Sequence, residues 1–298
     1  MSDLVEERRR VALVTDSTAL LTDQVTRSRD IRVVPLQVVL GARSYDEGDP
    51  QATPQTIASA LAEFTPVSTS RPAPQRFLDA YRAAAEDGAE QVVSVHLSGE
   101  VSGTYESALL AARDAPVPVH AVDTRQLGMA VGFAVLAAAD ALDAGATASE
   151  AAESARRRAR STTSLFYVDT LEYLRRGGRI GAAAALLGTA LSVKPLLRIE
   201  DGRVATVEKV RTAARAISRL EELARRAAED AEGRPVDVAV GHLANPERAD
   251  QLAENLRRCL APHLAEDLGG GVSVGEVGAV IGAHVGPGMV AVVVAPRV

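Results

Sequence analysis

Short apolar runs alternate with amphipathic stretches along most of the chain. The first run, at 11–14, stops at the polar residues 15–18, which is the pattern of a buried strand with polar side chains at its C-terminal end. The same criterion predicts further strands at 31–40, 92–97, 117–122, 165–168, 196–199, 203–210 and 236–240. Helical periodicity and start signals predict helices at 54–64, 74–86, 105–113, 126–144, 147–160, 171–175, 212–230 and 246–260.

This order of elements predicts an α/β protein of two domains. In the first half, strands and helices alternate, which favours a parallel sheet. In the second half, Asp201 and Gly202 form a hairpin signal between two strands, so the sheet there is expected to be mixed. The length of 298 residues fits two compact units. We place the division before the strand at 165–168, which gives an N-terminal α/β domain at 1–162 and a C-terminal α/β domain at 163–298.

The C-terminal stretch 277–296 is almost uncharged and has about the length of a membrane span. Gly286, Pro287 and Gly288 interrupt it, and a proline between two glycines does not continue a helix. We therefore expect two short strands, or a loop and a strand, instead of a helix that crosses a membrane.

Composition narrows the classes of function. Hydrophobic residues make up 47% and charged residues 24% of the chain, which argues against wholesale disorder. The net charge of −6 and the lack of Trp argue against nucleic-acid binding. Cys259 is the single cysteine, so no internal disulfide can form, and the charged N-terminal residues do not read as a signal peptide. We expect a cytoplasmic protein.

The candidate chemistry lies in two hydroxyl-rich segments, 68–70 and 98–104. Both are predicted at strand ends or helix N-termini, where hydroxyl and backbone N–H groups can bind an anion, although plain helix capping uses the same residues. Arg179 follows two glycines that let the backbone approach closely, as in an anion site or a solvated turn. His284 stands among apolar residues, and the structural alternative for it is a hydrogen-bonded core histidine. The histidines lack metal-ligand spacing, so no metal is expected.

Several segments together resemble the DegV family. They are Thr15-Asp16-Ser17-Thr18, Thr69-Ser70-Arg71-Pro72, 97–108, 173–180, Lys194-Pro195-Leu196-Leu197, Lys209-Val210-Arg211-Thr212 and His284-Val285-Gly286-Pro287-Gly288, in matching order over nearly the whole chain. The resemblance implies a two-domain α/β protein with a tunnel near the domain interface that holds a long-chain fatty acid. It also implies a bacterial carrier subunit for a separate ATP-dependent fatty-acid kinase that serves phospholipid synthesis.

By that resemblance, Thr69 and Ser102 hold the fatty-acid carboxylate, and Arg179 and His284 form the supporting polar network. No cofactor besides the bound fatty acid is implied. The chain departs from the family pattern at Arg71 and Glu106, where Gln is usual, and at Gly99, where Ser is frequent. Arg71 is then a candidate contact for the kinase or for the carboxylate itself.

The leading hypothesis is therefore a non-catalytic carrier. It binds a fatty acid, presents the carboxylate to the kinase subunit and holds the acyl-phosphate product, with no nucleic-acid partner and at most transient membrane contact. Segments 182–187 and 277–281 are candidate walls of the tunnel, and ordinary core is their alternative. A second hypothesis is a lipid esterase or thioesterase with Ser102 as nucleophile and His284 as base. A third is a regulator that binds a phosphorylated small molecule.

Overall fold

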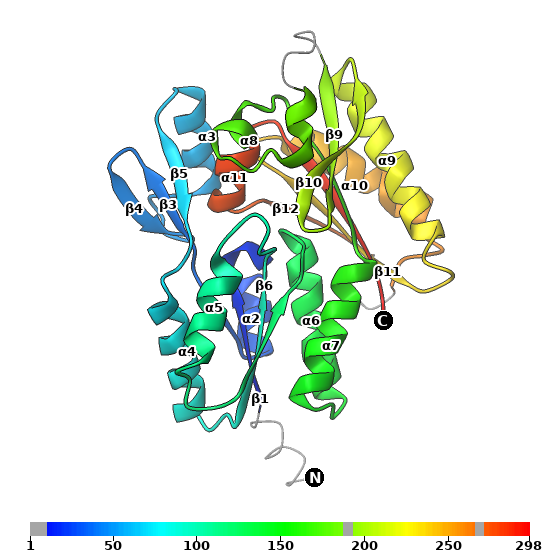
Figure 1. Ribbon diagram of the computed structural model, residues 1–298. Coiled ribbons are helices and arrows are strands. Elements are labelled where there is room, and N and C mark those ends of the chain that lie inside the picture. Colours follow the sequence, from blue (N-terminus) through cyan, green and yellow to red (C-terminus); the bar gives the residue numbers. More distant parts are fainter. Residues whose placement is uncertain (1–10, 187–192, 266–270) are drawn as a thin grey trace. The chain divides into compact units, whose positions relative to one another are not determined.

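The computed structural model describes residues 11–186, 193–265 and 271–298 (Figure 1). They form two compact units, the first made of 11–36 and Ser70–Arg160, the second of Gln37–Thr69 and Ser161–Arg297. The predicted single division after 162 differs from this grouping, because Gln37–Thr69 belongs with the second unit. Pro35 lacks an N–H group and interrupts the predicted strand 31–40, so its two halves join different sheets.

The first unit is built on a parallel sheet, as predicted. Its strands are ordered β2-β1-β6-β7, and all three pairings are parallel. The elements of this unit are β1 (Val11–Asp16), η2 (Ser17–Ala19), α2 (Asp23–Ser28), β2 (Ile31–Val34), α4 (Pro74–Glu86), β6 (Gln91–His96), α5 (Thr104–Ala112), β7 (Val119–Asp123), α6 (Met129–Asp143) and α7 (Ala148–Ser161).

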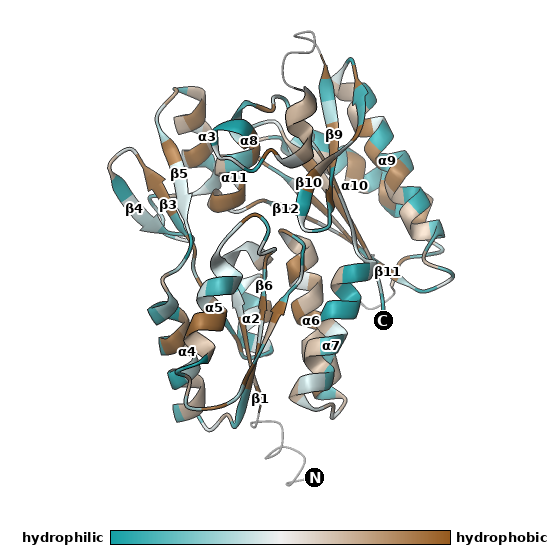
Figure 2. Cartoon of the chain, viewed as in Figure 1, coloured by the Kyte–Doolittle hydropathy of each residue, from teal (hydrophilic) through white to brown (hydrophobic). Residues whose placement is uncertain are grey.

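Both faces of this sheet are covered by helices. Alternate residues of β1 point to opposite faces, so Leu13 packs with α6 and α7, whereas Val14 packs with α4 and α5. Figure 2 shows the apolar strands between these helices. The chain runs from β1 outward to β2 and later from β6 outward to β7. The adjacent C-terminal ends of β1 and β6 therefore mark the point where the strand order reverses, which is the usual place for ligands in open α/β sheets.

The second unit contains a mixed six-stranded sheet ordered β10-β9-β8-β13-β11-β12, as the hairpin signal predicted. Asp201 and Gly202 have positive φ angles of 51° and 81°, which is the geometry of a tight hairpin turn. The elements of this sheet and its two long helices are β8 (Thr163–Tyr167), β9 (Lys194–Glu200), β10 (Arg203–Val210), α9 (Ala213–Glu229), β11 (Val236–His242), α10 (Pro246–Leu260), β12 (Val272–Glu276) and β13 (Val290–Pro296).

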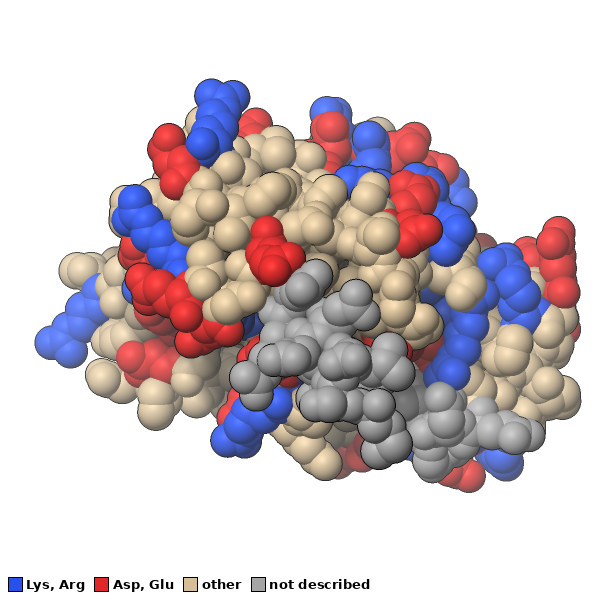
Figure 3. Space-filling view, turned by 90° about the horizontal axis from the view of Figure 1, so that it is seen from below, with Lys and Arg blue, Asp and Glu red and all other residues tan. Residues whose placement is uncertain are grey.

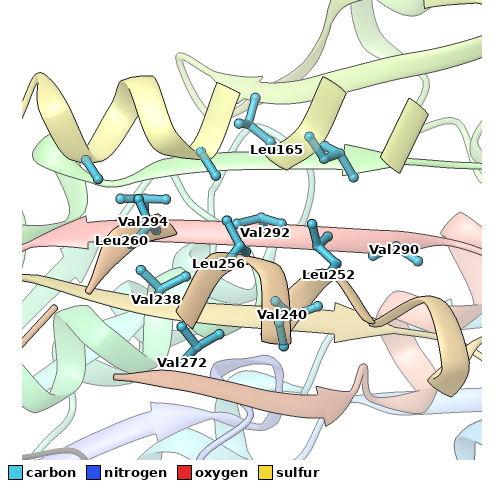
Figure 4. Close-up of a cluster of buried hydrophobic side chains, with 14 of the residues drawn as sticks. Leu165, Val238, Val240, Leu252, Leu256, Leu260, Val272, Val290, Val292 and Val294 are labelled. Carbon is cyan, nitrogen blue, oxygen red and sulfur yellow. The ribbon is translucent and has the colours of Figure 1, made fainter. Parts of the chain in front are cut away.

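The core of this unit lies between the sheet and its long helices. Leu252, Leu256 and Leu260 come from one stripe of α10 and pack on valines of the sheet, such as Val240 and Val292 (Figure 4). Spacing of four residues places these leucines on one helix face. The unit also contains α3 (Pro54–Ala62), α8 (Glu172–Arg176), η3 (Gly181–Leu186), α11 (Ala279–Val285) and a small sheet of β3 (Gln37–Leu40), β4 (Arg43–Asp46) and β5 (Val67–Ser70).

The sequence interpretation was wrong about two segments. Residues 67–70 form the strand β5 instead of a loop. The stretch 277–296 forms the short helix α11 followed by β13, rather than two strands or a loop and a strand. Gly286 ends α11 with a φ of 75°, so the glycines break the stretch as predicted but leave one helical segment before the break. Among the described residues, no helix is long and apolar enough to cross a membrane.

Acidic and basic side chains are interspersed on the face of the molecule that is shown in Figure 3.

Candidate functional site

Thr69 lies on β5 with its side chain turned inward. The strand alternates, so Ser68 and Ser70 are exposed and Thr69 is half-buried. Its Oγ1 lies 2.8 Å from Nε2 of His284. The capping alternative for this hydroxyl segment fails, because the N-cap of the next helix is Ala73 and makes no side-chain hydrogen bond. The structure therefore brings together Thr69 and His284, two predicted site residues that are 215 positions apart in the sequence.

His284 occupies the last turn of α11, and its imidazole is neutral at physiological pH. Burial, and secondarily the charge of Arg179, lowers the pKa of His284 to about 4. Its Nδ1 is buried and has no hydrogen-bond partner in the described part of the chain. We assign the proton to Nε2, since a buried N–H without an acceptor would cost more than an unpaired lone pair. Nε2 then donates to Thr69 Oγ1, and the Thr69 hydroxyl hydrogen is available to a ligand.

Gly177, directly after α8, provides the space that His284 occupies. A Cβ atom at this position would lie 2.2 Å from Nδ1 of His284, well inside contact distance. The φ of Gly177 is −73°, so close approach, not backbone conformation, calls for glycine here. Nη1 of Arg179 donates a hydrogen bond to the Gly177 carbonyl oxygen. The glycine-rich segment singled out in the sequence thus forms the support behind His284.

Helix α11 is itself held in place by a carboxylate. Glu47 Oε1 accepts a hydrogen bond of 2.8 Å from the backbone N–H of Val280, in the first turn of α11. A carboxylate at a helix N-terminus is favoured by the unpaired N–H groups and by the helix dipole. This contact positions the helix that carries His284, and sequence reasoning missed it because Glu47 follows a distant strand.

Ser102 belongs to the first unit and lies in the loop before α5. Its Oγ is 2.8 Å from Oγ1 of Thr104 and accepts a 3.4 Å hydrogen bond from the Thr104 backbone N–H. Ser98 holds the same loop, since its carbonyl oxygen accepts the Ser102 N–H at 3.2 Å and its Oγ accepts the Glu100 N–H at 3.2 Å. The hydroxyl of Ser102 is thus half-buried and hydrogen-bonded to Thr104, the first residue of α5, whose N-cap is Gly103. That it binds the same ligand as Thr69 stays a prediction.

A buried polar chain lies at the ends of β1 and β6. Asp16 Oδ2 is 3.0 Å from His96 Nδ1, His96 Nε2 is 2.7 Å from Ser94 Oγ, and Ser94 Oγ is 2.9 Å from the Tyr81 hydroxyl. Burial raises the pKa of Tyr81 to about 12. Asp16 also accepts the backbone N–H of Leu97 at 3.1 Å, which fixes the start of the loop that leads to Ser102. In the sequence, Ser94 and His96 stand at alternate positions of an otherwise apolar strand. That pattern could have indicated these buried hydrogen bonds.

Other predicted features have mixed outcomes. In the segment 182–187, Ala183 is buried and its alanine neighbours are exposed, while 187 lies outside the described residues. In 277–281, Val277, Ala279 and Val280 are buried. The tunnel wall stays a prediction for both segments. The described residues contain no cluster of His, Cys, Asp and Glu that could hold a metal ion.

Comparisons with known proteins agree on one family. A family profile described as an uncharacterised protein of the DegV family matches residues 10–297. A DegV domain-containing protein of Streptomyces coelicolor is 55% identical over 289 residues, which cover 97% of this chain and 99% of that protein. A structure described as fatty acid binding of a DegV family protein from Thermus thermophilus has a TM-score of 0.87 at 35% identity, and covers 96% of this chain and 99% of its own.

A second solved structure, of DegV, a fatty acid binding protein from Bacillus subtilis, has a TM-score of 0.84 at 29% identity and covers 97% of this chain and 99% of its own. Both likenesses cover nearly the whole chain. The chain therefore belongs to the DegV family.

Proposed function

We propose that this protein binds a long-chain fatty acid and that the Thr69 hydroxyl donates a hydrogen bond to its carboxylate. The observation that carries this proposal is the pair of Thr69 and His284, because a neutral imidazole that donates to Thr69 Oγ1 turns the hydroxyl hydrogen toward a ligand. A carboxylate accepts such a bond and offers no proton in return. The fatty-acid-binding relatives from Thermus thermophilus and Bacillus subtilis support the same ligand class.

Binding energy and orientation have different sources in this proposal. About 14 buried methylenes at ~0.8 kcal/mol each contribute on the order of 11 kcal/mol before the costs of association are subtracted. The polar groups contribute less, yet they determine which end of the ligand lies at the hydroxyls. Ser102 is proposed as a second donor to the carboxylate, and the positive charge of Arg179 as a long-range attraction for it.

We further propose that the carboxylate is presented to a separate kinase subunit in the cytoplasm, where ATP is available. In that reaction a carboxylate oxygen bonds to the γ-phosphorus of ATP, the bond from that phosphorus to the bridging oxygen breaks, and ADP leaves. The carboxylate is already deprotonated, so the carrier needs to supply no base. The carrier then holds the acyl phosphate, which would hydrolyse in water.

His284 fits this role better than the role of a general base in an esterase. A base with a pKa of about 4 takes a proton poorly near neutral pH. Its Nε2 is engaged by Thr69, and among the described residues no carboxylate orients its Nδ1. These features favour a histidine that orients a hydroxyl.

Native mass spectrometry of the purified full chain, followed by lipid extraction, tests the proposal. We expect one fatty acid per chain, and a protein that carries and binds none contradicts the proposal.

Thr69→Val removes the donor at nearly constant volume and is expected to weaken binding by about 2 kcal/mol, whereas Thr69→Ser retains the hydroxyl and most of the affinity. Ser102→Ala is expected to cost about 1–2 kcal/mol, and unchanged affinity would remove Ser102 from the site. Turnover of acyl esters by the protein alone, lost in Ser102→Ala, would establish the esterase instead.

A further inference from the structure

Arg71 lies directly against the backbone of the loop that carries Ser102. Its Nη1 donates a 3.4 Å hydrogen bond to the carbonyl oxygen of Gly103, the residue after Ser102. A Cβ atom at position 103 would lie 2.1 Å from that Nη1 and 2.8 Å from Cδ of Arg71. The absence of a side chain at Gly103 therefore makes room for the Arg71 guanidinium against the loop, at the residue next to Ser102.

The guanidinium is restrained by a contact that a ligand can replace. Nη1 lies 3.3 Å from Oε2 of Glu106, and the two side chains are 52% and 68% exposed. An exposed ion pair of this length is weak. Among the described residues, the contacts of the Arg71 guanidinium all involve Nη1. A ligand with two acceptor oxygens can therefore engage the rest of the donor fork without first breaking a strong bond.

The polar groups around this loop become more exposed from Thr104 outward. Thr104 is fully buried, Ser102 is half-buried and Arg71 is exposed. When a carboxylate is converted into an acyl phosphate, the added phosphoryl group lies beyond the carboxyl carbon, farther from the acyl chain. With the carboxylate held by the Ser102 hydroxyl, as proposed above, an exposed cation against the same loop is placed to meet that added group.

We propose that Arg71 is a specificity residue that binds the phosphoryl group of the acyl phosphate, with Glu106 competing for the same guanidinium. The proposal rests on the proposed function, since it assigns a head group to that same site. A phosphoryl group has a charge between −1.5 and −2 near neutral pH and three acceptor oxygens, whereas a carboxylate has a single charge and two oxygens. Arg71 is therefore expected to favour product over substrate, and Glu106 to moderate that preference so that both are held.

The test compares two ligands of equal chain length on the full protein. They are palmitate and the β-ketophosphonate analogue of palmitoyl phosphate, in which CH2 replaces the bridging oxygen and prevents hydrolysis. Arg71→Gln is expected to weaken binding of the ketophosphonate about tenfold and that of palmitate about twofold or less. Glu106→Gln is expected to tighten ketophosphonate binding about threefold, because the guanidinium loses its competitor. In the double variant the Glu106 effect should vanish.

Arg225→Gln is a matched control, because Arg225 forms an exposed ion pair with Glu229 on α9 and should change neither affinity. An equal loss for both ligands in Arg71→Gln overturns the inference and assigns Arg71 to support of the loop. Unchanged affinities in Arg71→Gln overturn it as well. If the unmodified protein binds neither ligand, the proposed function fails together with the inference. If it binds palmitate and Arg71→Gln leaves the preference intact, the inference fails alone.

Discussion

Replacement of Gly177 by alanine tests whether His284 acts by orienting Thr69. The new Cβ atom would lie 2.2 Å from Nδ1 and 2.8 Å from Cε1 of His284. An ordinary contact needs at least 3.4 Å, so the imidazole must move by about 1.2 Å. The backbone needs no change, because Gly177 has a φ of −73° that alanine adopts readily. The substitution therefore displaces one side chain and leaves the charge of the site unchanged.

The displacement is nearly half the length of the 2.8 Å hydrogen bond from His284 to Thr69. The imidazole must either overlap the hydroxyl or turn and misalign the bond, and in both cases Thr69 loses its fixed orientation. A hydrogen bond to a charged ligand contributes roughly 1.5–3 kcal/mol, so we expect a loss of about 2 kcal/mol, or about thirtyfold in Kd for a fatty acid. The unfolding free energy should fall too, because the core must accommodate the added methyl group.

Isothermal titration of delipidated protein with palmitate measures this loss. Gly275→Ala in β12 is the matched control, since a Cβ at Gly275 meets nothing within 4 Å and should leave Kd unchanged. A second comparison places Gly177→Ala in a His284→Ala background, where the clash no longer exists and the two losses should not add. If Gly177→Ala binds palmitate within about twofold of the unmodified protein, or if the losses add fully, the orienting role of His284 is refuted.

Three further predictions concern stability. Burial lowers the pKa of His284 from 6.5 to about 4, so the stability of the fold is greatest above about pH 6.5 and falls by about 3 kcal/mol as the pH drops to about 4. In His284→Asn the urea midpoint should depend less on pH over this window, and the same pH dependence in both proteins would contradict this prediction. Leu256→Ala should lower the free energy of unfolding in urea by about 3 kcal/mol, because Leu256 is fully buried. Leu110→Ala, at a position that is 45% exposed, should lower it little, and equal losses in the two variants would refute the burial argument. Asp16→Ala strips the carboxylate from the buried His96 and should cost about 3 kcal/mol or more, measured in the same way, and a neutral result would show that this chain of hydrogen bonds is dispensable.

Local pattern was sufficient for most of the elements. The apolar run 11–14 predicted the strand β1, the proline at 74 predicted the start of α4, and the Asp201–Gly202 turn predicted the hairpin. Each signal acts within a few residues: a buried apolar run, a missing N–H group and positive φ angles. The strand β5 escaped this reasoning. Its four residues are short and rich in hydroxyls, and they form a strand because β3 supplies a partner edge.

The candidate site was predictable as residue types and not as contacts. Thr69 and His284 are 215 residues apart, and no local period indicates that the inward face of β5 meets the last turn of α11. Glu47 gave no functional signal, since it is an ordinary acidic residue in the sequence. The glycines before Arg179 indicated a close backbone approach, but the sequence did not show that His284 fills the space at Gly177. Their roles exist only through the position of α11.

The sequence by itself determined the α/β class, the parallel sheet of the first unit, the hairpin of the second and the resemblance to the DegV family, because each depends on neighbours along the chain or on motifs in a fixed order. Only the tertiary structure decided that Gln37–Thr69 joins the second unit and that His284 is buried behind Thr69 with a low pKa. Desolvation and side-chain contact depend on which distant segments pack together, and that follows from the folded core rather than from any local run of residues.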